Sequence, residues 1–256
     1  MLNAYQLSAI SILIFIILIF IVAQIKNDNS KIDIGWGTGF IVSAFTMLFL
    51  NINLKLIFVF LILFIWGSRL SIYIYIRSKG KPEDFRYTEM RKNWGSRQKF
   101  NAFYRVFLLQ AVLMYIINLP IISAFHKGQA EFSPVNVAGL IIFVVGFLFE
   151  TTADLQMYRF KKEESNKGKI IKSGLWKYSR HPNYFGEMIL WWGIYLFTFQ
   201  TETFWWTIIS PALISFLLLK VSGVPMLEKK FEKNPEWEIY RENTPAFFPS
   251  FRKVKK

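Results

Sequence analysis

The sequence contains no cysteine and only two histidines, and these shortages narrow the chemistry open to the chain. Without cysteine there is no disulfide, no thiolate metal site and no cysteine nucleophile. The histidines, His126 and His181, lie far apart in the sequence, so a histidine-based metal site is not expected. We predict that the chain binds no metal ion.

The sequence also lacks a long soluble block and a linker. Hydrophobic residues make up 53% of the 256 residues and occur in long runs, which is typical of a polytopic membrane protein. The first run has no basic segment before it and no small-residue cleavage pattern after it, so we expect a retained span and not a signal peptide. We predict one all-α integral membrane domain over 1–256 with seven transmembrane helices, at about 5–25, 34–52, 54–76, 102–125, 134–158, 183–199 and 204–222.

Acidic residues are scarce beside basic ones, 17 against 31, and the excess is unevenly placed. The loops 77–99 and 159–182 and the tail 223–256 each hold eight lysines or arginines, whereas the loops of the opposite side hold only Lys55 and Lys127. The positive-inside rule then predicts an outer N-terminus and a cytoplasmic C-terminus. Because the cations lie between apolar spans and in the tail, we expect membrane lipids and an anionic ligand as partners, and no nucleic acid.

The second predicted span opens Gly-Trp-Gly-Thr-Gly, with glycines at 35, 37 and 39. A nucleotide-binding loop would need a strand before it, and none is expected here. Small residues also let two membrane helices approach closely, and this second explanation is the one we expect.

The most informative segment runs from Gly174 to Glu187, just before an apolar run. Pro182 is placed for the first turn of a helix, whose N–H groups and dipole favour an anion such as phosphate. Arg180 and His181 add positive charge there. The alternative is a basic loop at the membrane edge that contacts lipid head groups. Asn183 and Glu187, spaced i, i+4 on one helix face, argue against it, since a carboxylate would repel an acidic lipid.

Four charged residues lie near the cytoplasmic ends of predicted spans, where each needs a partner or a wet cavity. They are Arg69, Glu150, Asp154 and Glu187. Helical spacing places Trp66, Arg69 and Tyr73 on one face, and Glu150, Asp154 and Tyr158 on another. One interpretation is a set of buried ion pairs that fix helix order. The other is a polar pocket open to the cytoplasm with an apolar, aromatic deep wall.

The chain resembles a bacterial membrane family of undefined function that is grouped with the steroid 5-alpha-reductases. The resemblance covers nearly the whole chain. It is carried by Asp33…Trp36-Gly37, Glu83-Asp84…Arg86-Tyr87, Glu150…Ala153-Asp154…Gln156, Gly174-Leu175-Trp176…Arg180-His181-Pro182-Asn183-Tyr184-Phe185-Gly186-Glu187, Ser222-Gly223-Val224-Pro225…Glu228 and Tyr240…Thr244…Pro249.

This resemblance implies seven transmembrane helices that enclose NADPH from the cytoplasmic side of a bacterial inner membrane. It implies hydride transfer to the C=C bond of an α,β-unsaturated carbonyl in a lipophilic substrate taken from the bilayer. It places Asp154, Asn183 and Glu187 on the cofactor, with further site residues at Arg69, Glu150, Tyr178, Arg180, His181 and Tyr184.

The proton donor departs from the reductase pattern. Trp66 falls where the reductases carry a tyrosine that hydrogen-bonds the substrate carbonyl, and an indole cannot deliver an acidic proton as a phenol can. We therefore expect another donor, Tyr73 or Tyr5, and take Asp33 as the candidate for the substrate-binding acid.

Arg-His-Pro-x-Tyr-x-Gly is also similar to a segment by which isoprenylcysteine and phospholipid methyltransferases bind S-adenosylmethionine, followed by an acidic residue in a tail helix. Glu228 is compatible with that acidic position. Three functions therefore stay open: an NADPH-dependent reductase, an S-adenosylmethionine-dependent methyltransferase of a lipid or lipidated substrate, and a non-catalytic lipid-binding protein. The lipid substrate and the oligomeric state are left open.

Overall fold

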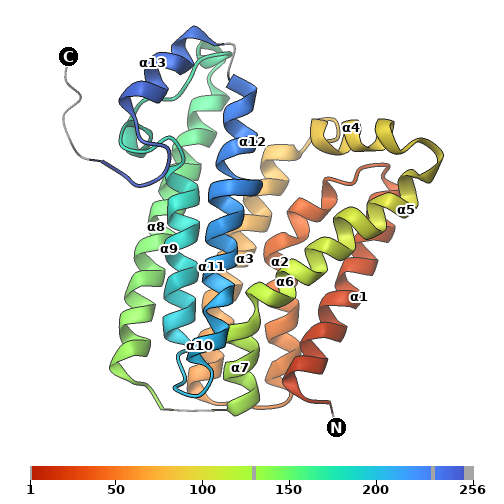
Figure 1. Ribbon diagram of the computed structural model, residues 1–256, viewed down its shortest axis with the longest axis vertical. Coiled ribbons are helices and arrows are strands. Elements are labelled where there is room, and N and C mark those ends of the chain that lie inside the picture. The colour runs from red at the N-terminus through yellow and green to blue at the C-terminus, as the bar shows by residue number, and fades with distance from the viewer. Residues whose placement is uncertain (1, 129–130, 232–233, 251–256) are drawn as a thin grey trace. The chain divides into compact units, whose positions relative to one another are not determined.

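A computed structural model describes residues 2–128, 131–231 and 234–250 (Figure 1). Every regular element among these residues is a helix, which confirms the predicted all-α class. Chain contacts divide the protein into two compact units. Unit 1 comprises residues 1–133 and 198–207, and unit 2 comprises residues 134–197 and 208–256.

Unit 1 begins with three long helices joined by short turns. Its elements in chain order are α1 (Ala4–Ile25), α2 (Lys31–Leu48), α3 (Leu54–Ser78), α4 (Phe85–Trp94), η1 (Gly95–Arg97), α5 (Gln98–Ala102), the π-helix η2 (Phe103–Leu108), α6 (Leu109–Ile117), α7 (Leu119–Lys127) and α10 (Phe204–Thr207). Asn3 and Asn53 cap α1 and α3 by accepting hydrogen bonds from backbone N–H groups of the first turn. Gly95, with φ of +51°, ends α4 in a conformation that favours glycine.

Glycines set the distance between α2 and α3. A Cβ added to Gly37 would lie 2.4 Å from the carbonyl oxygen of Gly67, and one added to Gly67 would lie 2.5 Å from that of Gly37. Gly35 and Gly39 instead face side chains, those of Phe15 and Met114. The predicted role of the glycine pattern in close helix packing is therefore confirmed.

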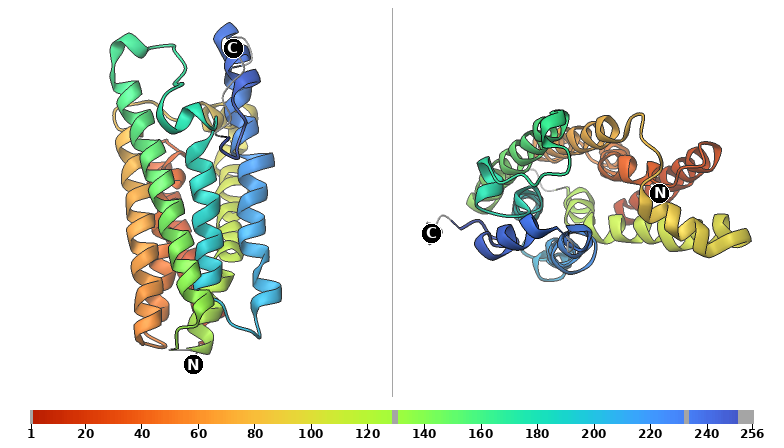
Figure 2. Two further views of the ribbon diagram at one scale, coloured as in Figure 1. Left: turned by 90° about the vertical axis from the view of Figure 1, so that its left-hand side faces the viewer. Right: turned by 90° about the horizontal axis from the view of Figure 1, so that it is seen from above.

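Unit 2 is built on two helices that lie side by side, α8 (Pro134–Lys162) and α9 (Pro182–Phe197) (Figure 2). A Cβ on Gly139 or Gly146 of α8, or on Gly186 or Gly193 of α9, would come within 2.5 Å of backbone atoms of the other helix. On each helix the two glycines are seven residues apart, so the helices approach each other closely at two successive levels. The remaining elements of unit 2 are η3 (Glu164–Asn166), η4 (Gly174–Lys177), α11 (Ile209–Phe216), the π-helix η5 (Leu217–Val221), α12 (Val224–Glu228), η6 (Lys229–Phe231) and α13 (Pro235–Asn243).

Five helical stretches are long and apolar enough to cross a membrane: Ala4–Ile25, Leu54–Ser78, Phe85–Ile117, Pro134–Lys162 and Phe204–Glu228. They overlap five of the seven predicted spans. The other two predicted spans correspond to α2, which has 18 residues and includes Lys31 and Asp33, and to α9, which has 16 residues. Several apolar helices thus support an integral membrane protein, whereas the count of seven spans and the orientation of the termini stay predictions.

Candidate functional site

The segment 174–187 folds as predicted at its centre, because α9 begins at Pro182. Before it, η4 is attached to α8 by two hydrogen bonds. The backbone N–H of Leu175 donates to Oε1 of Gln156 at 2.9 Å, and Nε1 of Trp176 donates to the carbonyl of Ala153 at 3.1 Å. The segment therefore reaches the start of α9 from a fixed position on α8.

The guanidinium of Arg180 is held on several sides. Its Nε and NH2 groups donate to the two carboxylate oxygens of Glu228, at 2.9 and 3.2 Å. Its NH1 group donates to the carbonyls of Arg241 and Thr244, at 2.9 and 2.6 Å. Only 9% of the Arg180 side chain is exposed. The cation that the sequence assigned to an anionic ligand is thus already neutralised by Glu228 and joined to the tail.

His181 shares the same carboxylate. Its Nε2 lies 3.1 Å from Oε1 of Glu228, and its ring stacks on that of Tyr184 with the centroids 5.7 Å apart. The side chain of Glu228 is 19% exposed, so this pairing is shielded from solvent. Arg180, His181, Tyr184 and Glu228 therefore form one cluster in unit 2, which brings together four of the predicted cofactor-binding residues.

The tail returns over this segment and closes it. The carbonyl of Phe247 accepts from the hydroxyl of Ser179 at 2.8 Å, and the carbonyl of Tyr178 accepts from the N–H of Ser250 at 2.9 Å. The hydroxyl of Tyr240 donates to the carbonyl of Trp176 at 2.5 Å. Burial, together with the nearby charge of Glu228 and against that of Arg180, raises the pKa of Tyr240 above its ordinary value, so the phenol stays neutral as a donor.

A second polar group lies where α8 and α9 touch. Nδ2 of Asn183 donates to Oδ1 of Asp154 at 3.2 Å. Asp154 and Glu150, one helical turn apart on α8, are 4% and 2% exposed, and Glu187 on α9 is partly buried. Gly186 allows this proximity, because a Cβ there would lie 2.4 Å from the backbone nitrogen of Glu150. Asp154 and Asn183, which the resemblance assigns to the cofactor, are therefore in direct contact.

These two groups differ in what they fit chemically. The carboxylates and amide of the α8–α9 group suit a ligand with hydroxyl or carboxamide groups, such as a ribose or a nicotinamide. The Arg180 cluster offers a paired cation and therefore suits a phosphate less well than the sequence indicated. NADPH and S-adenosylmethionine both contain ribose, and the donor set on α8 and α9 accommodates either.

The remaining predicted site residues lie in unit 1. The carboxylate of Asp33 accepts from the hydroxyl of Tyr87 at 2.6 Å and from NH2 of Arg86 at 2.8 Å. The candidate substrate-binding acid thus joins α2 to α4. Trp66 is fully buried and packs edge-on against Phe40, with the centroids 5.7 Å apart.

Tyr73 and Arg69 lie one helical turn apart on α3, and both are partly buried. The guanidinium of Arg77 lies over the ring of Tyr73, 5.5 Å from its centroid. Tyr5, the other expected donor, packs its ring against that of His126, with the centroids 5.1 Å apart. In unit 2, the Nζ atom of Lys177 lies over the ring of Tyr178, 5.9 Å from the ring centroid.

Sequence reasoning missed the backbone acceptors that bind Arg180 and Ser179. The carbonyls of residues 241, 244 and 247 belong to a segment with no charge pattern of its own, and no side-chain signal marks a carbonyl as an acceptor. Thr244 was part of the family pattern, but its contribution comes from its backbone. Only the geometry shows it.

Comparison with known proteins places the chain in a family. Residues 19–244 match the model of the family described as "Protein of unknown function (DUF1295)", and the chain belongs to that family. An uncharacterized protein of Schizosaccharomyces pombe, C594.04c, is 27% identical over 212 residues, which cover 72% of this chain and 60% of the relative. No solved structure gives a significant match.

Two shorter similarities point to enzymes. A probable O-methyltransferase of Ustilaginoidea virens, ustE, is 40% identical over 57 residues, which cover 22% of this chain and 20% of that protein. A steroid 5-alpha-reductase of Gossypium hirsutum, DET2, is 42% identical over 57 residues, which cover 22% of each chain. The chain thus spans about 60% of the first relative's length and about a fifth of the other two.

Proposed function

We propose that the protein is a membrane-embedded NADPH-dependent reductase, which transfers a hydride to the C=C bond of an α,β-unsaturated carbonyl in a lipophilic substrate. The partly buried hydrogen bond between Asn183 and Asp154, where α8 and α9 touch, carries the proposal. It assembles an amide and carboxylates at the start of α9, which is the kind of site that holds the ribose or carboxamide of a nucleotide. Similarity to the steroid 5-alpha-reductase of Gossypium hirsutum supports this class of reaction.

The membrane arrangement belongs to the same proposal. Seven spans, with α2 and α9 included, place the basic loops and the tail on one side, and that side is cytoplasmic in a bacterial inner membrane. The cofactor then comes from the cytoplasm and the substrate from the bilayer. The paired glycines let α9 pack closely against α8.

When bound, NADPH would supply the hydride for the β-carbon of the enone. The chain supplies orientation through Asp154, Asn183 and Glu187, and a proton for the α-carbon. Tyr73 is the proposed proton donor, because Trp66 has no acidic hydrogen. The products are the saturated carbonyl compound and NADP⁺, so one hydride and one proton are consumed in each turnover.

Methyl transfer from S-adenosylmethionine is the second candidate, and one observation favours it. Arg180 is paired with Glu228 and has little capacity left for a pyrophosphate or a 2′-phosphate. S-adenosylmethionine carries no phosphate, so a site of carboxylates and an amide can bind its ribose without a free cation. The similarity to the probable O-methyltransferase ustE agrees with this candidate.

Thermal-shift measurements on the full chain in detergent distinguish the two. A ligand that binds only the folded state raises the melting temperature, and its stabilising free energy grows as RT ln(1 + L/Kd), where L is the concentration of free ligand. We expect stabilisation by NADPH that exceeds the effect of S-adenosylmethionine, and weaker stabilisation in Asn183→Ala. The control is Asn93→Ala, since Asn93 is exposed on α4 in the other unit.

The same experiment defines failure. Stabilisation by S-adenosylmethionine alone would replace the reductase by the methyltransferase. No response to either ligand in a folded preparation would leave a non-catalytic lipid-binding protein as the better description. An Asn183→Ala protein that binds NADPH as the wild type does would exclude Asn183 from the cofactor site.

A further inference from the structure

Unit 1 contains an apolar groove that the proposed reaction does not use. It lies between the last turns of α1 and the start of the α5–η2 helix, and has a volume of about 560 Å³. Both walls belong to stretches that are long and apolar enough to span a membrane, Ala4–Ile25 and Phe85–Ile117. We therefore take the groove to face the hydrocarbon of the bilayer.

The lining is aromatic at its base and aliphatic at its edge. Phe20 packs edge-on against Phe103, with the ring centroids 5.1 Å apart, and both line the groove. Ile21 and Ile25 of α1, which are 48% and 72% exposed, form one edge, and Tyr104 forms part of the other. The π-helix η2 contributes Phe103 and Tyr104, and such irregular turns often occur at binding sites.

One end of the groove carries a positive charge. Lys99 lines it, and no described residue forms an ion pair with this exposed lysine. Gln24 is the other polar lining residue, and no acidic side chain lines the groove. An apolar groove that ends at a lysine is complementary to a molecule with an acyl chain and an anionic head.

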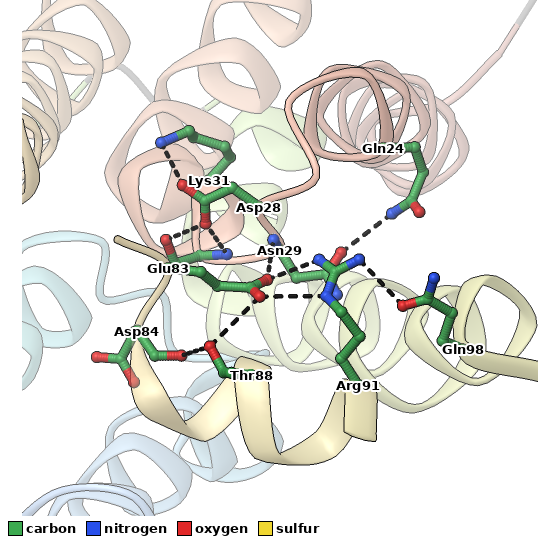
Figure 3. A network of polar contacts seen from close by, with 10 residues as sticks. Gln24, Asp28, Asn29, Lys31, Glu83, Asp84, Thr88, Arg91 and Gln98 are labelled. Carbon is green, nitrogen blue, oxygen red and sulfur yellow. Dashed lines mark hydrogen bonds and ion pairs between the residues drawn. The ribbon is translucent and has the colours of Figure 1, made fainter. Parts of the chain in front are cut away.

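A polar network fixes this charged end (Figure 3). Nε2 of Gln24 donates to Oδ1 of Asn29 at 3.0 Å, and the N–H of Asn29 donates to Oε1 of Glu83 at 2.6 Å. Glu83 accepts two bonds from Arg91, whose NH1 group donates to Gln98 at 3.0 Å. The network thus joins the end of α1 to Gln98, the residue before Lys99, and so positions the backbone from which the Lys99 side chain extends.

We propose that this groove is a binding site for an anionic phospholipid, with an acyl chain between α1 and η2 and the phosphate on Lys99. The acids of the network do not oppose this, because Glu83 is paired with Arg91 and Asp28 with Lys31. The exposed cations Lys92 and Arg97 lie outside the lining and add only long-range attraction.

The test measures the affinity of the full chain in detergent for dioctanoyl phosphatidylglycerol and dioctanoyl phosphatidylcholine, by thermal shift at low salt. We expect tighter binding of phosphatidylglycerol, weakened about fivefold in Lys99→Ala because one lysine near a lipid phosphate contributes about that factor. Lys92→Ala, which removes the same charge outside the groove, should change the affinity less than twofold. Ile21→Trp, at an exposed position, should weaken binding of both lipids by filling the groove.

Three results would overturn the proposal. They are equal affinity of the wild type for the two lipids, equal losses in Lys99→Ala and Lys92→Ala, and an Ile21→Trp protein that binds as the wild type does. A change of oligomeric state in Ile21→Trp without a change in lipid affinity would assign the groove to a second copy of the chain instead.

Discussion

Arg180 and Glu228 meet through two parallel hydrogen bonds, 2.9 Å from Nε to Oε1 and 3.2 Å from NH2 to Oε2, although 48 positions separate them in the sequence. Two-pronged pairs of this kind fix orientation as well as distance. The pair joins the end of α12 to the residues before α9. It makes Arg180 a positioning residue for the start of α9 and for the tail.

The first prediction concerns the energetic coupling of this pair. Removal of one partner should destabilise the protein by about 3 to 5 kcal/mol, since the other charge is left largely buried. The double variant Arg180→Ala/Glu228→Ala should lose less than the sum of the single variants. Chemical denaturation in mild detergent supplies the four free energies of unfolding for a double-mutant cycle.

Lys172 and Glu236 provide the matched control for that cycle. They also form an ion pair in unit 2, at 3.4 Å, but their side chains are 44% and 56% exposed. Their coupling energy should be below about 1 kcal/mol, as for other exposed pairs. Equal coupling in the two pairs would contradict the positioning role of Arg180.

The second prediction concerns alkaline pH. The pKa of Tyr240 is raised in the folded state, so its contribution to stability is complete below the ordinary tyrosine pKa of about 10 and is lost as pH rises through the folded value. The melting temperature of the wild type should therefore fall more steeply above about pH 10 than that of Tyr240→Phe. If the melting temperatures of the two proteins fall by the same amount between pH 8 and pH 11, burial does not keep the Tyr240 hydroxyl protonated.

The third prediction separates two glycines of α2. Gly37→Ala should destabilise the protein by about 1 to 3 kcal/mol, because the added Cβ meets backbone of α3 that cannot move aside. Gly35→Ala should cost less, since its Cβ would lie 3.3 Å from the side chain of Phe15. Melting temperatures of both variants, compared in one detergent, test the difference. A larger loss in Gly35→Ala would reject glycine-mediated approach of α2 to α3.

The fourth prediction concerns the attachment of α4. Asp33→Ala removes the acceptor for both Arg86 and Tyr87, so α4 should detach more often and trypsin should cleave the loop 77–99 several times faster. Glu89→Ala is the control, because Glu89 is exposed on the same helix. The cleavage rate is read from gels of the purified protein. Equal rates in the wild type and in Asp33→Ala would mean that Asp33 does not hold α4 in place.

Sequence patterns predicted the helices well because their signals are local. The apolar runs located α1, α3 and α8, Pro182 located the start of α9, and the glycines of α2 indicated close packing. The resemblance assigned Asn183 and Asp154 to one cofactor, and the two side chains are in contact. Such features depend on residues that are neighbours on one helix or on one motif.

The partners of charged residues could not be predicted in the same way. Arg180 pairs with Glu228, and Asp33 pairs with Arg86 and Tyr87 of the next basic loop, and neither pairing was expected from the sequence. A cation in a sequence carries no indication of which acid reaches it after folding. The choice is made by tertiary structure, through turns and tail segments whose paths have weak signals.

The carbonyls of residues 241, 244 and 247 that bind Arg180 and Ser179 come 61 to 68 positions later in the chain. During synthesis, the start of α9 therefore waits in an incomplete state until α11, α12 and α13 have been made. Until then Arg180 lacks both its acidic partner Glu228 and the carbonyl acceptors of residues 241 and 244.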